Sequence, residues 1–325
     1  MRSILIHIDV MPPAALLAVS LRRRLFGASA LATVGAFTMP LARAGDGWQP
    51  AVLPQGVQRD IDSAITGQRY RIYLHIPATP APVGGHSVLY ALDGNATFPA
   101  LALMARSTAS RSARTGQVAP VIVGIGYPSG QDFGGGRARD YTPHIAPRIT
   151  ASGKEQPAGE GGADRFLDFI ERELKPLIAG LAPLDPTRQA LFGHSYGGLC
   201  TLHALFTRPG MFQTYLAASP SIWYGERVVL SELAGLAKRT AALPGKPALM
   251  LSAGELEQFR TRGPAPQGHE AVAAERRMVG EAQDLADRLA RSDSLSRVQF
   301  HLLAGENHGS AMFPAMARGM EFFLG

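Results

Sequence analysis

The sequence predicts an α/β domain with a mostly parallel central sheet and helices on both of its faces. Short apolar runs bounded by turn residues recur along the chain, and amphipathic helical patterns separate them. The runs are nearly continuous in apolar residues, which is typical of parallel strands covered on both faces. With 46% hydrophobic and 18% charged residues, the chain can bury a substantial core. We find no internal boundary and predict one domain over residues 45–325.

Seven segments are predicted as strands. RYRIYLHIP (69–77) alternates polar and apolar side chains, so we expect it at an outer, antiparallel position. The more apolar segments are 86–92, 118–127, 188–195, 212–219, 247–254 and 297–305.

Helical patterns lie between these strands. The segment 163–181 carries an apolar stripe at helical spacing, 270–292 predicts one long helix with a charged face, and 311–325 predicts a closing helix. Two Gly- and Pro-rich stretches, 128–163 and 259–268, interrupt the alternation. We expect both at the carboxyl ends of strands, where open α/β sheets bind ligands.

Residues 1–44 have the pattern of an export signal. Arginines at positions 22–24 precede an apolar run, and Ala42-Arg43-Ala44 forms a small-x-small cleavage pattern. The segment LRRRLFG is similar to a twin-arginine signal, which predicts a folded protein exported to the periplasm. The alternative, an N-terminal membrane anchor, is disfavoured by Pro40 and by the cleavage pattern. We therefore expect the mature chain to make no membrane contact.

The charge of the chain gives no support to nucleic-acid binding. Five arginines and one aspartate lie in residues 1–44, so the rest of the chain carries +2 of the total +6. It contains no basic helix and no aromatic-basic motif, and we expect no nucleic-acid partner. The single cysteine, Cys200, excludes an internal disulfide and a multi-cysteine metal site. We predict neither a metal site nor a cofactor.

A serine between two glycines suggests the chemistry. Ser195 stands in GHSYG (193–197), after an apolar strand and before a helical segment at 197–206. In α/β hydrolases this G-x-S-x-G pattern is a sharp strand-to-helix turn that exposes a nucleophilic serine. The alternative is an ordinary turn, but the strand-then-helix context favours the nucleophile.

A serine nucleophile in such a fold needs a carboxylate and a histidine that follow it in the chain. Of the later histidines, His308 lies just beyond the last predicted strand and before the last helix, where the base is expected. The acid is expected after the strand at 247–254, where Glu255 and Glu257 both stand. Glu257 is favoured because it lies further past the end of the strand, and Glu255 is the alternative. Glutamate can replace aspartate in this role.

Two backbone N–H groups must hold the oxyanion that forms on attack. The amide of Tyr196, next to the serine, is one candidate. The loop after the strand at 86–92 offers the second, with Asn95 as the donor and Gly94 allowing the turn. This Asp-Gly turn can also be purely structural.

Seven ordered motifs span the chain from about residue 55 to the C-terminus: LYALDGNATF, RARDYTPH, GGADRFLDFIERELKPLI, GHSYGGL, AASPSIWY, SAGELEQ and GENHGSAMF. Together they resemble the putative-esterase family of α/β hydrolases, and most of all its ferric-siderophore esterases of the enterobactin and salmochelin type. The resemblance implies the α/β-hydrolase fold and cleavage of catecholate trilactones, with Ser195 as nucleophile and His308 as base. It implies a small-molecule partner, a ferric catecholate siderophore, whose iron belongs to the substrate.

The same resemblance implies substrate contacts from Arg137 and Arg139 in RARDYTPH and from Trp223 in AASPSIWY. Guanidinium groups pair with and stack on planar catecholate anions. The competing interpretations are solvated loop arginines and a core tryptophan. A general or feruloyl-type carboxylesterase and a siderophore-binding module without turnover are alternative functions. The sequence sets neither the siderophore nor the oligomeric state.

Overall fold

The computed structural model describes residues 56–145, 160–258 and 268–325, and the predicted export signal at 1–44 lies outside them. In this part of the chain the strands form one 8-stranded sheet of order β1-β2-β4-β3-β5-β6-β7-β8. The strands are β1 Val57–Asp62, β2 Arg69–His75, β3 His86–Leu92, β4 Val121–Gly126, β5 Leu184–His194, β6 Thr214–Ala218, β7 Ala248–Gly254 and β8 Arg297–Leu303.

The strand directions confirm the predicted α/β-hydrolase fold. β1 pairs antiparallel with β2 and β2 pairs antiparallel with β4, while the remaining neighbours are all parallel. Each of the predicted strands is present, and β2 is antiparallel as predicted, but β1 rather than β2 occupies the outer position of the sheet. β1 was not predicted, because VQRDID is almost wholly exposed and carries no apolar alternation.

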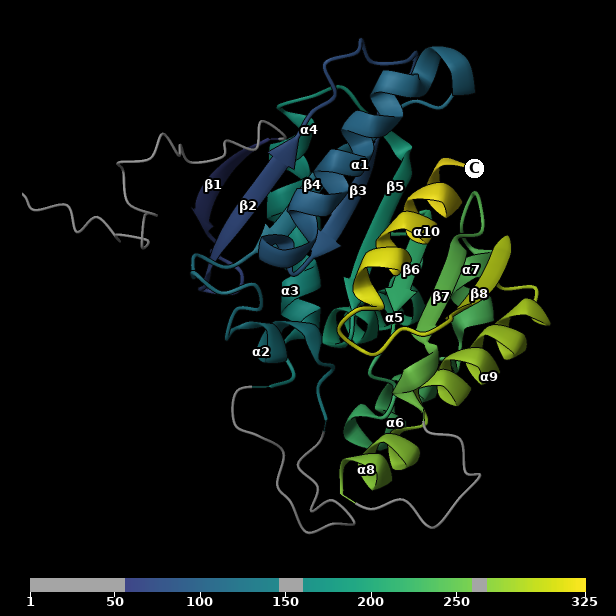
Figure 1. The fold of residues 1–325 in the computed structure, drawn as a ribbon. Helices are drawn as coiled ribbons and strands as arrows, with labels where there is room; N and C mark the ends of the chain where they lie inside the picture. The colour runs from purple at the N-terminus through teal and green to yellow at the C-terminus, as the bar shows by residue number, and fades with distance from the viewer. Residues whose placement is uncertain (1–55, 146–159, 259–267) are drawn as a thin grey trace, which may run out of the picture. The chain divides into compact units, whose positions relative to one another are not determined.

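Helices cover both faces of the sheet (Figure 1). The structure describes α1 Gly94–Thr115, α2 Arg137–Tyr141, α3 Ala163–Phe169, a π-helical turn η1 Ile170–Leu174, α4 Lys175–Ala179, α5 Tyr196–Thr207, α6 Tyr224–Ser231, α7 Leu236–Ala241, a 3₁₀ turn η2 Glu255–Glu257, α8 His269–Arg276, α9 Met278–Ala290 and α10 Met312–Leu324. None of these helices combines the length and hydrophobicity needed to cross a membrane.

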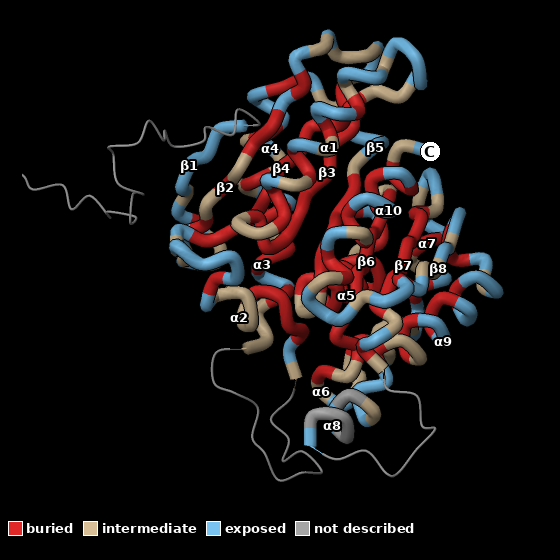
Figure 2. Tube along the Cα trace, viewed as in Figure 1, coloured by how far each residue is buried: buried red, intermediate tan, exposed pale blue. Residues whose placement is uncertain are grey.

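The alternation of side chains along the strands divides the core into two layers. On β3, Leu89 and Ala91 pack in the layer of α1 and α10, while Val88 and Tyr90 pack with α3 and α5. The central strands are buried along their length (Figure 2). Burial on both faces explains why they read as continuous apolar runs.

Two predicted helices are interrupted. The helix predicted at 163–181 contains the π-helical turn η1, which separates α3 from α4. The single helix predicted at 270–292 is wrong: it breaks at Arg277, which has a left-handed φ of 47° between α8 and α9. The Arg277 side chain donates to Glu281 and Asp284 on α9, and these contacts stabilise the left-handed turn between the two helices. The chain changes direction there, beside the carboxyl end of β7 (Figure 1).

Candidate active site

Ser195 occupies a strained turn between β5 and α5. Its φ of 60° and ψ of −117° are rarely adopted by a residue with a side chain. The Ser195 amide donates to the carbonyl of Ala218 on the neighbouring strand β6 (3.0 Å), which holds the turn in place. A Cβ at Gly193 would lie 2.1 Å from the Gly197 carbonyl oxygen, so the first glycine of the pattern is required by close packing.

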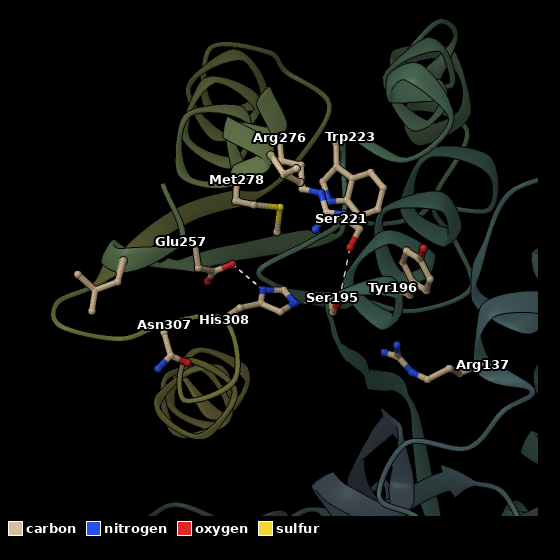
Figure 3. Close-up of a pocket in the computed structure, with 12 residues that line it drawn as sticks. Arg137, Ser195, Tyr196, Ser221, Trp223, Glu257, Arg276, Met278, Asn307 and His308 are labelled. Atoms are coloured by element: carbon tan, nitrogen blue, oxygen red, sulfur yellow. Dashed lines mark hydrogen bonds and ion pairs between the residues drawn. The ribbon is translucent and has the colours of Figure 1, made fainter. Parts of the chain in front are cut away.

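His308 reaches the serine from the loop between β8 and α10. The Ser195 hydroxyl donates to His308 Nε2 (3.0 Å), and His308 Nδ1–H donates to Glu257 Oε2 (2.7 Å). Asn307 shapes the loop, because its side-chain oxygen accepts from the amides of Gly309 and Ser310. The geometry is that of a nucleophile, a base and an orienting acid in series (Figure 3).

Glu257 and Glu255 have different contacts. The buried Glu257 accepts at Oε1 from the Ser219 hydroxyl (2.5 Å) and the Gly254 amide (2.6 Å), which leaves Oε2 for His308. Burial alone would raise the pKa of Glu257, but the hydrogen bonds from His308, Ser219 and Gly254 outweigh it and lower the pKa. Glu255 instead accepts from the Gly305 amide (3.0 Å) and ties the histidine loop to η2.

His194, inside the GHSYG turn, packs against His308. The two ring centroids are 4.8 Å apart, and His194 is buried. Burial and the neighbouring His308 lower the pKa of His194 to about 4, so it is neutral at physiological pH. A neutral ring contributes packing beside the base without adding a competing positive charge.

The predicted oxyanion donors lie at the starts of two helices. Tyr196 and Asn95 belong to the first turns of α5 and α1, where an amide has no acceptor within its own helix. The Asn95 side chain is engaged elsewhere, bridging the amide and carbonyl of Tyr127 (2.9 and 3.0 Å). Gly94 packs against β4, where a Cβ would lie 2.6 Å from Gly124. Tyr196 lines the cavity in front of Ser195, whereas Gly94 and Asn95 do not.

That cavity has a volume of about 550 Å³. The residues that line it are Arg137, Ser195, Tyr196, Ser221, Trp223, Leu256, Glu257, Val272, Arg276, Met278, Asn307 and His308. Polar groups from the catalytic loops face apolar side chains from η2, α8 and α9, a mixture typical of small-molecule sites.

Of the three predicted substrate-binding residues, two line the cavity and one does not. Trp223 and Arg137 line the cavity, but Arg137 is held by a bidentate ion pair with the buried Asp93 (2.8 and 2.9 Å). Arg139 is absent from the cavity lining, because its guanidinium pairs with the buried Asp140 (2.8 Å). Both arginines therefore have carboxylate partners within the fold.

Comparison with known proteins identifies the family. A family model described as "Putative esterase" matches residues 63–306. The chain belongs to this family. The ferri-bacillibactin esterase BesA of Bacillus subtilis is 34% identical over 278 residues, which are 84% of this chain and 90% of the relative. The siderophore enterobactin esterase of Emericella nidulans is 35% identical over 301 residues, which are 85% of this chain and 97% of that relative.

Solved structures agree with this assignment. The crystal structure of the BES protein from Bacillus cereus has a TM-score of 0.73 and 33% identity, covering 86% of this chain and 99% of that one. The resemblance expected from the sequence motifs is confirmed, and the chain is an ester hydrolase.

The side chains of the esterase's site that sequence reasoning missed include two serines and an arginine. Ser219 supports the acid, and Ser221 places its hydroxyl 3.5 Å from the Ser195 hydroxyl. Arg276 lies over the Trp223 ring, 4.0 Å from its centroid. The AASPSIWY motif could have indicated the two serines, since both follow a strand end. Arg276 carried no sequence signal, because it lay within what reads as one continuous helix. The described residues contain no cluster of metal-ligating side chains.

Proposed function

We propose that this esterase hydrolyses the ester bonds of catecholate siderophore trilactones of the ferric enterobactin type, in the periplasm, and so releases iron. One observation carries the substrate class. Relatives from a bacterium and a fungus, each aligned over 84% or more of this chain, are named for siderophores: ferri-bacillibactin in one case and enterobactin in the other. The iron is part of the substrate and needs no site of its own on the protein.

The acylation step follows from the hydrogen-bonded series. Ser195 Oγ attacks a lactone carbonyl carbon while His308 Nε2, 3.0 Å away, takes the hydroxyl proton. Glu257, in contact with Nδ1 at 2.7 Å, keeps the imidazole in the tautomer that accepts at Nε2 and stabilises the imidazolium. The amides of Tyr196 and Asn95 are the proposed donors to the oxyanion.

Collapse of the tetrahedral intermediate breaks the ester C–O bond. The proton on His308 passes to the departing alkoxide, which leaves as a hydroxyl group, and the acyl group stays on Ser195. A water molecule then gives its proton to His308 and attacks the acyl carbon. Collapse of this second tetrahedral intermediate returns the proton from His308 to Ser195 Oγ and releases the carboxylic acid, and a further ester of the opened lactone can enter.

Export to the periplasm is part of the proposal and rests on residues 1–44 of the sequence. Expression of the full chain, followed by fractionation, is expected to give a shortened product in the periplasm. Replacing Arg22 and Arg23 with lysines should hold the precursor in the cytoplasm if the signal is of the twin-arginine type. Unchanged export would exclude that route.

Chromatography with mass detection tests the substrate. The enzyme and the Ser195→Ala variant are incubated with ferric enterobactin, and ring-opened products are expected only with the unchanged enzyme. Hydrolysis of p-nitrophenyl butyrate is followed in parallel. An intact trilactone beside rapid cleavage of the simple ester would make the protein a general or feruloyl-type carboxylesterase instead.

A further inference from the structure

The cavity contains one cationic side chain whose charge is not neutralised by a carboxylate in the described part of the chain. Arg137 is paired with Asp93, and Glu257 is hydrogen-bonded to His308. Arg276 forms no ion pair with any described carboxylate within 4.0 Å. The Arg276 side chain is exposed, whereas the Glu257 side chain is buried, so the guanidinium is a charge that a ligand meets directly in the cavity in front of Ser195.

Trp223 holds the Arg276 guanidinium in place. The guanidinium carbon lies 4.0 Å from the centroid of the Trp223 ring, a close cation–π contact. The pair lies across the cavity from His308 and above Ser221 and Ser195 (Figure 3). A stacked guanidinium keeps its N–H edge available, so it can still donate two parallel hydrogen bonds to an anion.

The break at Arg277 is what brings Arg276 to this position. α8 ends at Arg276, and Arg277 turns away to pair with Glu281 (3.5 Å) and Asp284 (3.1 Å) on α9. Two adjacent arginines therefore have different roles, one tied to a helix and one facing the cavity. Near Tyr196, the Glu160 carboxylate accepts a hydrogen bond from the Tyr224 hydroxyl (2.7 Å).

We propose that Arg276 and Trp223 form a subsite for an aromatic ring that carries negative charge, and that this pair selects anionic rings over uncharged ones. Aromatic and apolar surfaces of Tyr196, Leu256 and Met278 line the space beside it, which suits a planar ring. The choice of a catechol-type anion as the ligand rests on the proposed function. Arg137 and Arg139, which the sequence favoured for this role, are occupied by their own carboxylates.

Inhibition of a simple ester tests the subsite without a siderophore. Hydrolysis of p-nitrophenyl butyrate is measured with increasing 2,3-dihydroxybenzoate, an anion, and with 2,3-dihydroxybenzamide, its uncharged counterpart. In the unchanged enzyme the anion is expected to have the lower inhibition constant, by about tenfold for a charge-assisted pair. In Arg276→Gln the two constants should become equal, and Arg276→Lys should restore part of the difference because it keeps the charge without the planar fork.

Arg59→Gln is the matched control, because it removes the same charge from an exposed position on β1. It should leave the ratio of the two constants as in the unchanged enzyme. An unchanged ratio in Arg276→Gln, or an equal loss in Arg59→Gln, overturns the proposal. The outcome is independent of trilactone cleavage: an enzyme that opens no trilactone but loses anion preference in Arg276→Gln has the subsite and another substrate.

Discussion

The Ser219 hydroxyl donates a 2.5 Å hydrogen bond to Glu257 Oε1, and the backbone of Ser219 has a positive φ of 41°. Ser219 is fully buried at the end of β6, and its amide donates to the Ser252 carbonyl on β7 (2.7 Å). A serine in this conformation is strained, and such strain is often found at functional sites. The contact fixes one carboxylate oxygen so that the other meets His308.

Ser219→Ala is expected to lower kcat by about tenfold with little change in KM, since one hydrogen bond to a charged group is lost. Steady-state kinetics on p-nitrophenyl butyrate measures this. Ser219→Gly is the second variant, because glycine adopts φ 41° without strain and keeps the fold. If Ser219→Gly retained full kcat, the hydroxyl would have no part in positioning Glu257.

The two glutamates of η2 should differ sharply in a matched pair of substitutions. Glu257→Gln removes the charge that stabilises the His308 imidazolium, and we expect kcat to fall by about 10²- to 10⁴-fold. Glu255→Gln still offers an oxygen to the Gly305 amide and should stay within about threefold of the unchanged enzyme. Equal losses from both substitutions would contradict the assignment of Glu257 as the acid.

Gly193→Ala should abolish activity and destabilise the fold by about 3 kcal/mol or more, because overpacking against backbone cannot be relieved by a rotamer change. The added Cβ would lie 2.1 Å from the Gly197 carbonyl oxygen. Gly180→Ala is the control: its Cβ would find the nearest atom at 3.5 Å, and its φ of −74° suits any residue. Thermal unfolding of both variants tests the difference, and similar melting temperatures would refute it.

Deprotonation of His203 is expected to lower the stability of the fold at alkaline pH. Although burial would lower its pKa, hydrogen bonds to Asp164 and Glu232 raise the pKa to about 9. Because the folded pKa is raised, the stabilisation is complete below about pH 6.5 and is lost as the pH rises through 9. We expect the free energy of unfolding to fall by roughly 2–3 kcal/mol over this range.

Urea unfolding at pH 6, 8 and 10 measures the effect, because these values span the range over which His203 loses its proton. His203→Gln should remove most of this pH dependence, whereas substitution of the exposed His144 should leave it intact. A steep dependence that survives in His203→Gln would assign the titration to another group.

Local sequence patterns were sufficient for much of the fold. Apolar runs on β3, β4, β6 and β7 reflect burial on both faces, and GHSYG marks the turn after β5. β1 escaped prediction because an exposed edge strand needs no apolar pattern. The break at Arg277 was not predicted either, because the residues on either side keep helical spacing. Contacts of Arg277 with α9 stabilise the left-handed turn.

The sequence by itself determined seven of the eight described strands, the serine turn, and a histidine and two carboxylates in the loops after the last strands. Only the tertiary structure decided which side chains meet. β7 and β8 lie side by side, with Gly254 opposite Leu303, so the loop of Glu257 and the loop of His308 leave the sheet together. Glu257 then reaches the imidazole while Glu255 reaches the Gly305 amide. Which glutamate contacts His308 depends on how the two loops fold against each other, and that is not encoded in local sequence patterns. The same holds for the ion pair that occupies Arg137 and for the position of Arg276 at the cavity.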